Sequence, residues 1–200
     1  MALFKPEVVK NTSGFLGVQE MGIIEFTDKS ADYDWADVFI QIEVAIPNSQ
    51  YTNTIDIKGS LEKNVVGEIT GGSVLKRLYN IFETIGCTAG INLQGDWEDE
   101  SGNEITNIAE YLNKRFAEGT PSETQVIPFN YVGYMYKVQN KKTKKVYTDI
   151  YPKLCSNSDK GKQELDSYIN WMDKKGYLKE YKETDKSSTP SVTQAALDNL

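Results

Sequence analysis

The 200-residue sequence contains no histidine, and this absence excludes several kinds of active site. Ser-His and Cys-His nucleophile pairs need an imidazole as base, and many metal sites need it as a ligand. Cysteine is also scarce, because only Cys87 and Cys155 are present and neither belongs to a CxxC pair. We therefore expect a reduced protein without a disulfide, a zinc site or a cofactor.

Long hydrophobic runs are missing as well. No run approaches the length that crosses a bilayer, and the first residues contain no long apolar stretch. These patterns predict a soluble, cytoplasmic protein that has no membrane partner. The chain is long enough for one hydrophobic core, which we expect over residues 1–182. Small and polar residues dominate 183–200, so this tail is predicted to be disordered.

Positive charge is concentrated in one part of the chain. The protein as a whole carries a net charge of −7, which taken alone disfavours nucleic acid as a partner. In the segment 126–162, however, eight lysines face two aspartates, a net charge of +6, and the rest of the chain therefore carries −13. A partner of negative charge would meet this segment first.

The same segment predicts a β-hairpin rich in tyrosine. Two runs of alternating residues, 126–139 and 145–151, flank the turn Asn140-Lys141-Lys142-Thr143-Lys144. Strand alternation places Tyr131, Tyr147 and Tyr151 opposite the apolar sides of their strands. Exposed rings stack on bases and lysines neutralise phosphates, so such a face suits a single-stranded nucleic acid. The alternative is an edge hairpin whose lysines only discourage aggregation.

Hydrophobic periodicity predicts the remaining elements. We expect strands over 18–26, 37–46 and 51–61, and helices over 73–85 and 160–175. Ser73 is predicted to cap the first helix and Gly86 to end it. Residues 87–125 are interpreted as an insertion that contains an acidic loop and a short helix around Ile108.

Two motifs in this part of the chain suggest chemistry but fit it poorly. The run Glu68-Ile-Thr-Gly-Gly-Ser73 lacks the Lys-Ser/Thr ending of a phosphate-binding loop. A calcium loop needs glycine at its sixth place and glutamate at its twelfth. Counted from Asp96, the acidic loop instead has glycine at the seventh place and Asn107 at the twelfth. A solvated acidic loop is the better interpretation, although general acid/base work by two of its carboxylates stays open.

The predicted order of elements, β-β-β-α-β-β-α, fits a β-rich α+β protein built on a five-stranded OB-fold-like barrel. OB-folds bind oligonucleotides with the loops between strands 1 and 2 and between strands 4 and 5. Here these loops are 27–36 and 139–144. The predicted nucleic-acid-binding residues come from the two loops and the hairpin: Tyr33, Trp35, Tyr131, Lys137, Lys141, Lys142, Lys144, Lys145, Tyr147, Tyr151 and Lys153.

The chain resembles the small single-stranded DNA-binding proteins of bacteriophages. The resemblance rests on the helix SVLKRLYNIFETIGC, on the hairpin with its lysine turn and on the segment IYPKLCSNSDKGKQELDSYINWM. It implies cooperative, sequence-tolerant binding of single-stranded DNA during phage replication and recombination in the host bacterial cytoplasm, without catalysis. It also implies replication or recombination proteins as partners. The tail offers only Asp198 and the terminal carboxylate for such recruitment, and a homo-oligomer and a preference for DNA over RNA stay open.

Two other functions remain as alternatives. In a phage structural or assembly protein the barrel would contact other proteins and the lysines would keep an edge soluble. In a nuclease the acidic segment would hold a divalent metal.

Overall fold

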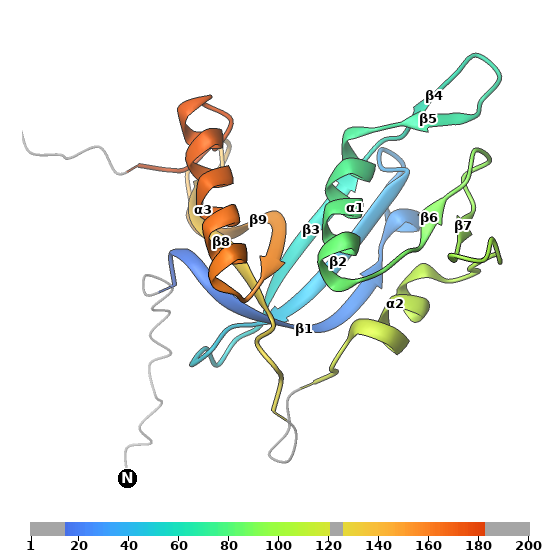
Figure 1. Cartoon of the computed structure of the whole chain (residues 1–200). Coiled ribbons are helices and arrows are strands. Elements are labelled where there is room, and N and C mark those ends of the chain that lie inside the picture. The colour runs from blue at the N-terminus through green and yellow to red at the C-terminus, as the bar shows by residue number, and fades with distance from the viewer. Residues whose placement is uncertain (1–14, 121–125, 183–200) are drawn as a thin grey trace, which may run out of the picture.

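The computed structural model describes residues 15–120 and 126–182, so the tail predicted at 183–200 lies outside them (Figure 1). Five strands form one antiparallel sheet in the order β3-β2-β1-β8-β9. Their bounds are β1 Gly17–Asp28, β2 Val38–Ala45, β3 Asn53–Gly59, β8 Tyr131–Gln139 and β9 Val146–Ser156. All five predicted strands are confirmed, with shifted ends. In the described residues no hydrogen-bonded pairing joins the edge strands β3 and β9, so the sheet is not closed.

Strand β1 belongs to both halves of the sheet. Its first part pairs with β8, from Gly17 opposite Met135 to Met21 opposite Tyr131, and its second part pairs with β2. The register shifts between Ile23 and Glu25, which bends the strand as Figure 1 shows. This bend curls the sheet.

The main core lies on the concave side of the curled sheet. Alternate residues of β2 and β3 are fully buried there, as the period of two predicts. Helix α1 (Ser73–Ile85) packs its apolar stripe onto them. Gly86 ends the helix with a φ of 76°, a left-handed conformation that glycine adopts without strain, as predicted. The predicted cap is wrong, because the N-cap is Gly72 and no side chain caps this end.

Helix α1 also bridges the two edges of the sheet. Near its first turn, Nη2 of Arg77 donates a hydrogen bond of 2.8 Å to the carbonyl oxygen of Lys58 in β3. Near its last turn, Oγ1 of Thr84 donates one of 3.0 Å to the carbonyl oxygen of Leu154 in β9. The helix therefore connects the C-terminal end of β3 to the C-terminal end of β9, the two edge strands of the sheet.

A second, smaller core lies on the other face of β8 and β9. Helix α3 (Asp159–Lys174) covers this face, and its cap residue Ser158 accepts a hydrogen bond of 3.1 Å from the N–H of Gly161. The buried residues of this second core are Val132, Cys155, Leu165, Ile169, Met172 and Leu178. Both faces of the hairpin are thus packed. The alternation in the sequence had predicted that one face of the hairpin is exposed to solvent.

The described part of the predicted insertion, residues 87–120, contains more regular structure than predicted. It includes a small ribbon of β6 (Gly90–Ile91) and β7 (Trp97–Glu98) and the expected short helix, α2 (Ile108–Phe116). The side chain of Asn113 in α2 bonds both the N–H and the carbonyl oxygen of Phe26, at 2.7 and 2.8 Å, and so ties α2 to β1. The predicted acidic loop is therefore a folded element whose Trp97 packs against the main core.

A second ribbon, β4 (Glu62–Lys63) and β5 (Ile69–Gly71), forms an arm that extends away from the sheet in Figure 1. The sequence patterns did not predict it, because its strands are two and three residues long. None of the described helices is long and apolar enough to cross a membrane.

Candidate nucleic-acid interface

The turn between β8 and β9, residues 140–145, is an ordered loop that carries four exposed lysines, Lys141, Lys142, Lys144 and Lys145. Oδ1 of Asn140 accepts hydrogen bonds of 2.9 Å from the N–H groups of Lys142 and Thr143. The Lys144 N–H donates one of 2.8 Å to the Asn140 carbonyl oxygen. The backbone is held by its own bonds, so the four ammonium groups project from a fixed loop.

Lys144 adopts an unusual backbone conformation, with a φ of 58°. A side chain with a Cβ is strained in this left-handed region by about 1–2 kcal/mol, whereas glycine is not. Stability alone would therefore favour glycine at this position. Strain of this kind concentrates at functional sites.

A surface groove of about 440 Å³ lies beside this turn, between β3 and β9. The residues that line it are Thr52, Asn53, Thr54, Asp56 and Lys58 on one side and Tyr147, Thr148, Asp149 and Ile150 on the other. Tyr147, which is 51% exposed, lies two residues after the lysine turn and offers a ring at the groove.

Two carboxylates face each other across this groove. Burial raises the pKa of Asp149, and the nearby Asp56 raises it further. Burial acts in the same sense on Asp56, but hydrogen bonds from Gln41 and Lys58 outweigh it and lower the pKa of that carboxyl. Lys58 lies 2.8 Å from Asp56, so this side of the groove is close to neutral.

Two of the three tyrosines predicted to stack on bases lie elsewhere. Tyr131 packs against the main core, and burial raises the pKa of its hydroxyl. Tyr151 lies under α3, with its hydroxyl 3.4 Å from that of Tyr168. The prediction that both occupy an open face is wrong, because each face of the hairpin meets a packed layer. Tyr147 lies beyond these layers and is exposed.

The other two tyrosines of β8, Tyr134 and Tyr136, pack against the second core. Burial raises the pKa of Tyr136 to about 12. The register of β8 against β9 does shift between Gly133 and Met135, and the extra residues lie in β9, where Tyr151, Pro152 and Lys153 stand opposite Tyr134. Proline suits such a bulge because it lacks the N–H that regular pairing needs.

Two of the predicted lysines contribute to the fold. Lys153 lies 3.1 Å from Glu164 and 5.1 Å from the ring centre of Tyr168, and its side chain is 15% exposed. Lys137 is half-buried, and its carbonyl oxygen accepts a hydrogen bond of 2.7 Å from the Tyr181 N–H. The four turn lysines remain the exposed cations of the predicted set.

The predicted aromatic loop lies away from the lysine turn. Tyr33 and Trp35 are 42% and 55% exposed, and their ring centres are 5.9 Å apart. They follow the end of β1, whereas the lysine turn adjoins its beginning, where Gly17 pairs with Met135. One ligand would have to run across the sheet to contact both loops.

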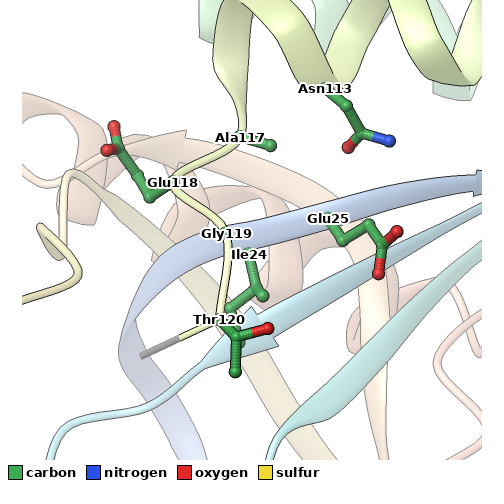
Figure 2. Close-up of a pocket in the computed structure, with 7 residues that line it drawn as sticks. All are labelled: Ile24, Glu25, Asn113, Ala117, Glu118, Gly119 and Thr120. Carbon is green, nitrogen blue, oxygen red and sulfur yellow. The ribbon is translucent and has the colours of Figure 1, made fainter. Parts of the chain in front are cut away.

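A second pocket, of about 470 Å³, lies between β1 and the segment after α2. Figure 2 shows the residues that line it, and among these are two carboxylates, Glu25 and Glu118, and no lysine or arginine. The N–H groups of Glu118 and Gly119 pair with the carbonyl oxygens of Ile23 and Ile24, at 3.2 and 3.0 Å. This pocket therefore suits a polyanion less well than the groove beside the lysines.

The acidic segment uses its carboxylates to build turns. Asp99 accepts hydrogen bonds from the N–H groups of Ser101 and Asn103, and the Asn103 side chain holds its pKa below the usual value. Within 15–120 and 126–182 no group of three or more acidic or cysteine side chains is placed to hold a metal ion. Both cysteines are buried and free, and burial raises the pKa of each thiol.

The sequence patterns missed one exposed aromatic pair, Trp171 and Tyr177 at the end of α3. The signal was present in the run WMDKKGYLKEYK, where rings alternate with lysines as they do in the hairpin. Hydrophobic periodicity predicts the helix from its buried residues and says nothing of the exposed rings at its end.

Comparison of the chain with protein-family models, with curated proteins and with solved structures finds no match.

Proposed function

We propose that this protein binds single-stranded DNA without strong sequence preference and without catalysis. The observation that carries the proposal is the fixed turn with four exposed lysines beside a groove and next to an exposed tyrosine ring. Lysines that track phosphates and rings that stack on bases are the two parts of a sequence-tolerant single-strand site. A duplex hides the faces of its bases, so it would use the lysines alone.

The arrangement of the strands supports an OB-fold as the finer description. Strands β1, β2 and β3 form a meander, α1 follows, and β8 and β9 form the closing hairpin. Because every pairing is antiparallel, β3 and β9 run in the same direction along the two edges. They line one groove, as expected of a barrel that is partly open. Single strands bind to this fold at its strand surface and loops.

In this proposal each part has a separate role. Lys141, Lys142, Lys144 and Lys145 contact successive phosphates, and Tyr147 stacks on a base at the mouth of the groove. The strain at Lys144 is tolerated because its ammonium group contributes to binding. The resemblance to phage proteins extends the role to the coating of replication and recombination intermediates.

The test is a titration of the full chain with a labelled oligo(dT), and with a duplex, at several salt concentrations. If four lysines contact phosphates, log affinity should fall against log salt with a slope near −3, from about −0.7 per contact on single strands. Replacing all four lysines by Gln should weaken binding and flatten the slope. The matched control replaces four other exposed lysines by Gln, all of them outside the turn: Lys63, Lys76, Lys114 and Lys160.

Failure of the wild-type protein to bind the oligonucleotide would refute the proposal. Equal affinity and slope in the lysine-turn variant and the control would remove the turn from the site.

A second candidate function is the assembly role considered from the sequence, and the arm formed by β4 and β5 favours it. Val65 and Val66 at the tip of this arm are 104% and 73% exposed, an unusual position for two β-branched apolar residues. An apolar tip of this kind suits insertion into another protein. Sedimentation of the wild type and of a V65D/V66D variant would test it, since loss of a self-assembled species in the variant is the expected result.

A further inference from the structure

The end of α3 presents two aromatic rings to solvent. Trp171 is 48% exposed and Tyr177 is 59% exposed, and their ring centres lie 5.8 Å apart in an edge-to-face arrangement. Large rings left in solvent lose the free energy that burial would supply, and two of them in contact offer faces on which bases can stack.

These rings are held from behind by a chain of aromatic contacts. Trp171 packs on Tyr168 at 5.9 Å between ring centres, and Tyr168 packs on Tyr151 at 5.8 Å. The chain continues to Tyr136 and Tyr134 in β8. On the other side the buried Leu178 fixes the backbone next to Tyr177. A ring that is already immobile loses little conformational entropy when a ligand stacks on it.

The chain after α3 returns to the lysine-bearing hairpin. In the described residues the pairing between β1 and β8 ends at Met135. The Tyr181 N–H donates its 2.7 Å hydrogen bond to the Lys137 carbonyl oxygen. Lys137 lies two residues before the end of β8, so the segment 176–182 adjoins the base of the lysine turn.

The segment that carries the two rings has a small excess of positive charge. Lys174, Lys175 and Lys179 are exposed and alternate with the rings along the chain. Asp173 and Glu180 also lie here, and Lys182 approaches Asp173 at 3.5 Å. Four lysines against two acidic residues leave 171–182 with a net charge of +2 in a chain whose total is −7.

We propose that Trp171, Tyr177 and the lysines Lys174, Lys175 and Lys179 form a second stacking platform, which extends the path of a single DNA strand beyond the lysine turn. This inference rests on the proposed function, because the same strand occupies both parts. Bases stack on the Trp171 and Tyr177 rings, and the three lysines contact the phosphates between them. The path then runs from the groove, past the turn, and onto the end of α3.

The test uses the full chain and two labelled oligo(dT) probes at the ends of the range of site sizes known for one OB-fold, about 4 and about 16 nucleotides. Trp171→Ala should weaken binding of the long probe at least about fivefold, from the contribution of one stacked base. The salt slope should not change, because no charge is removed. Replacement of Lys174, Lys175 and Lys179 by Gln should instead reduce the slope by about 2.

Tryptophan fluorescence gives a readout that does not depend on a stability change. Stacking on a base should quench Trp171, so the long probe should quench W171F less than it quenches the wild type. W171F keeps an aromatic ring and should retain most of the affinity. V65A/V66A is the matched control for loss of exposed apolar surface and should bind as the wild type does.

Three results separate the two proposals. If the wild type binds neither probe, the proposed function fails and the platform with it. If the wild type binds, the lysine-turn variant is weakened, and W171A and W171F match the wild type in affinity and quenching, the platform is overturned while the function stands. Loss of affinity in W171A together with reduced quenching in W171F supports the platform.

Discussion

The ammonium group of Lys153 lies 3.1 Å from a carboxylate oxygen of Glu164, so this lysine ties β9 to α3. The hairpin therefore carries lysines of two kinds, and they should respond differently to the same substitution. Lys153→Gln should lower the free energy of unfolding by about 1 kcal/mol, because it removes a partly buried ion pair and a contact with the Tyr168 ring. Urea denaturation measures this loss, and a change in the salt slope of DNA binding would contradict the assignment.

Lys144→Gly should stabilise the protein and weaken DNA binding. Glycine adopts the observed φ of 58° without strain, so we expect a gain of about 1 kcal/mol in the free energy of unfolding. Removing one phosphate contact should reduce the salt slope by about 0.7. Lys142→Gly is the control, since Lys142 has no positive φ and glycine there should not stabilise. A stability loss in K144G would contradict the account of strain.

Tyr147→Ala should weaken DNA binding by about 1–3 kcal/mol and leave the melting temperature nearly unchanged, because the ring is half exposed at the groove. Tyr151→Ala should do the opposite, with a loss of about 3 kcal/mol in stability, because that ring packs between β9 and α3. Binding titrations and thermal melts of the same two variants decide. Binding loss without destabilisation in Y151A would show that the face under α3 is open to the ligand.

Asp149→Asn should stabilise the protein at neutral pH. The pKa of Asp149 is raised in the folded state by burial and by Asp56, so ionisation of this carboxyl opposes folding. Below the unfolded pKa the carboxyl is protonated in both the folded and the unfolded state, so it costs no stability. The loss of stability grows as pH rises from the unfolded pKa to the folded pKa and is complete above the folded pKa. The stabilising effect of D149N should therefore be seen at neutral pH and vanish in acid. Unfolding curves across pH 3–7 test this, and an effect that persists unchanged in acid would contradict it.

The same substitution should tighten DNA binding, because it removes a negative charge from the groove beside the lysine turn. Asp159→Asn, at the start of α3, is a control for the change in net charge alone.

Strong periodicity explains which parts of the fold could be predicted from sequence. The alternation of Val38, Ile40, Ile42 and Val44 predicts a strand with one buried face, and the stripe along 74–85 predicts α1. The ribbons β4-β5 and β6-β7 have strands too short for any period to be visible. They form because neighbouring backbone groups pair in space, which a one-dimensional pattern does not contain.

The candidate site was predicted in part for a similar reason. The lysine turn follows from local composition, since Asn and Lys interrupt two strands. Alternation along β8 places Tyr131 and Tyr134 on opposite faces of the hairpin. It does not show whether a given face is covered by α3 or exposed to solvent. The run of rings and lysines at 171–182 is a local signal for Trp171 and Tyr177, but their place near the hairpin depends on the return of the chain after α3, which no period indicates.

The double membership of β1 has a consequence for the order in which the protein folds. Its pairing with β2, which in turn pairs with β3, joins neighbours along the chain, whereas its pairing with β8 must wait for closure of the long loop between them. We expect the β1-β2-β3-α1 unit to form early and the β8-β9 hairpin to dock onto it late. Pulsed hydrogen exchange should then protect Ile40 and Ile42 before Val132, and the lysine turn should be put in place last.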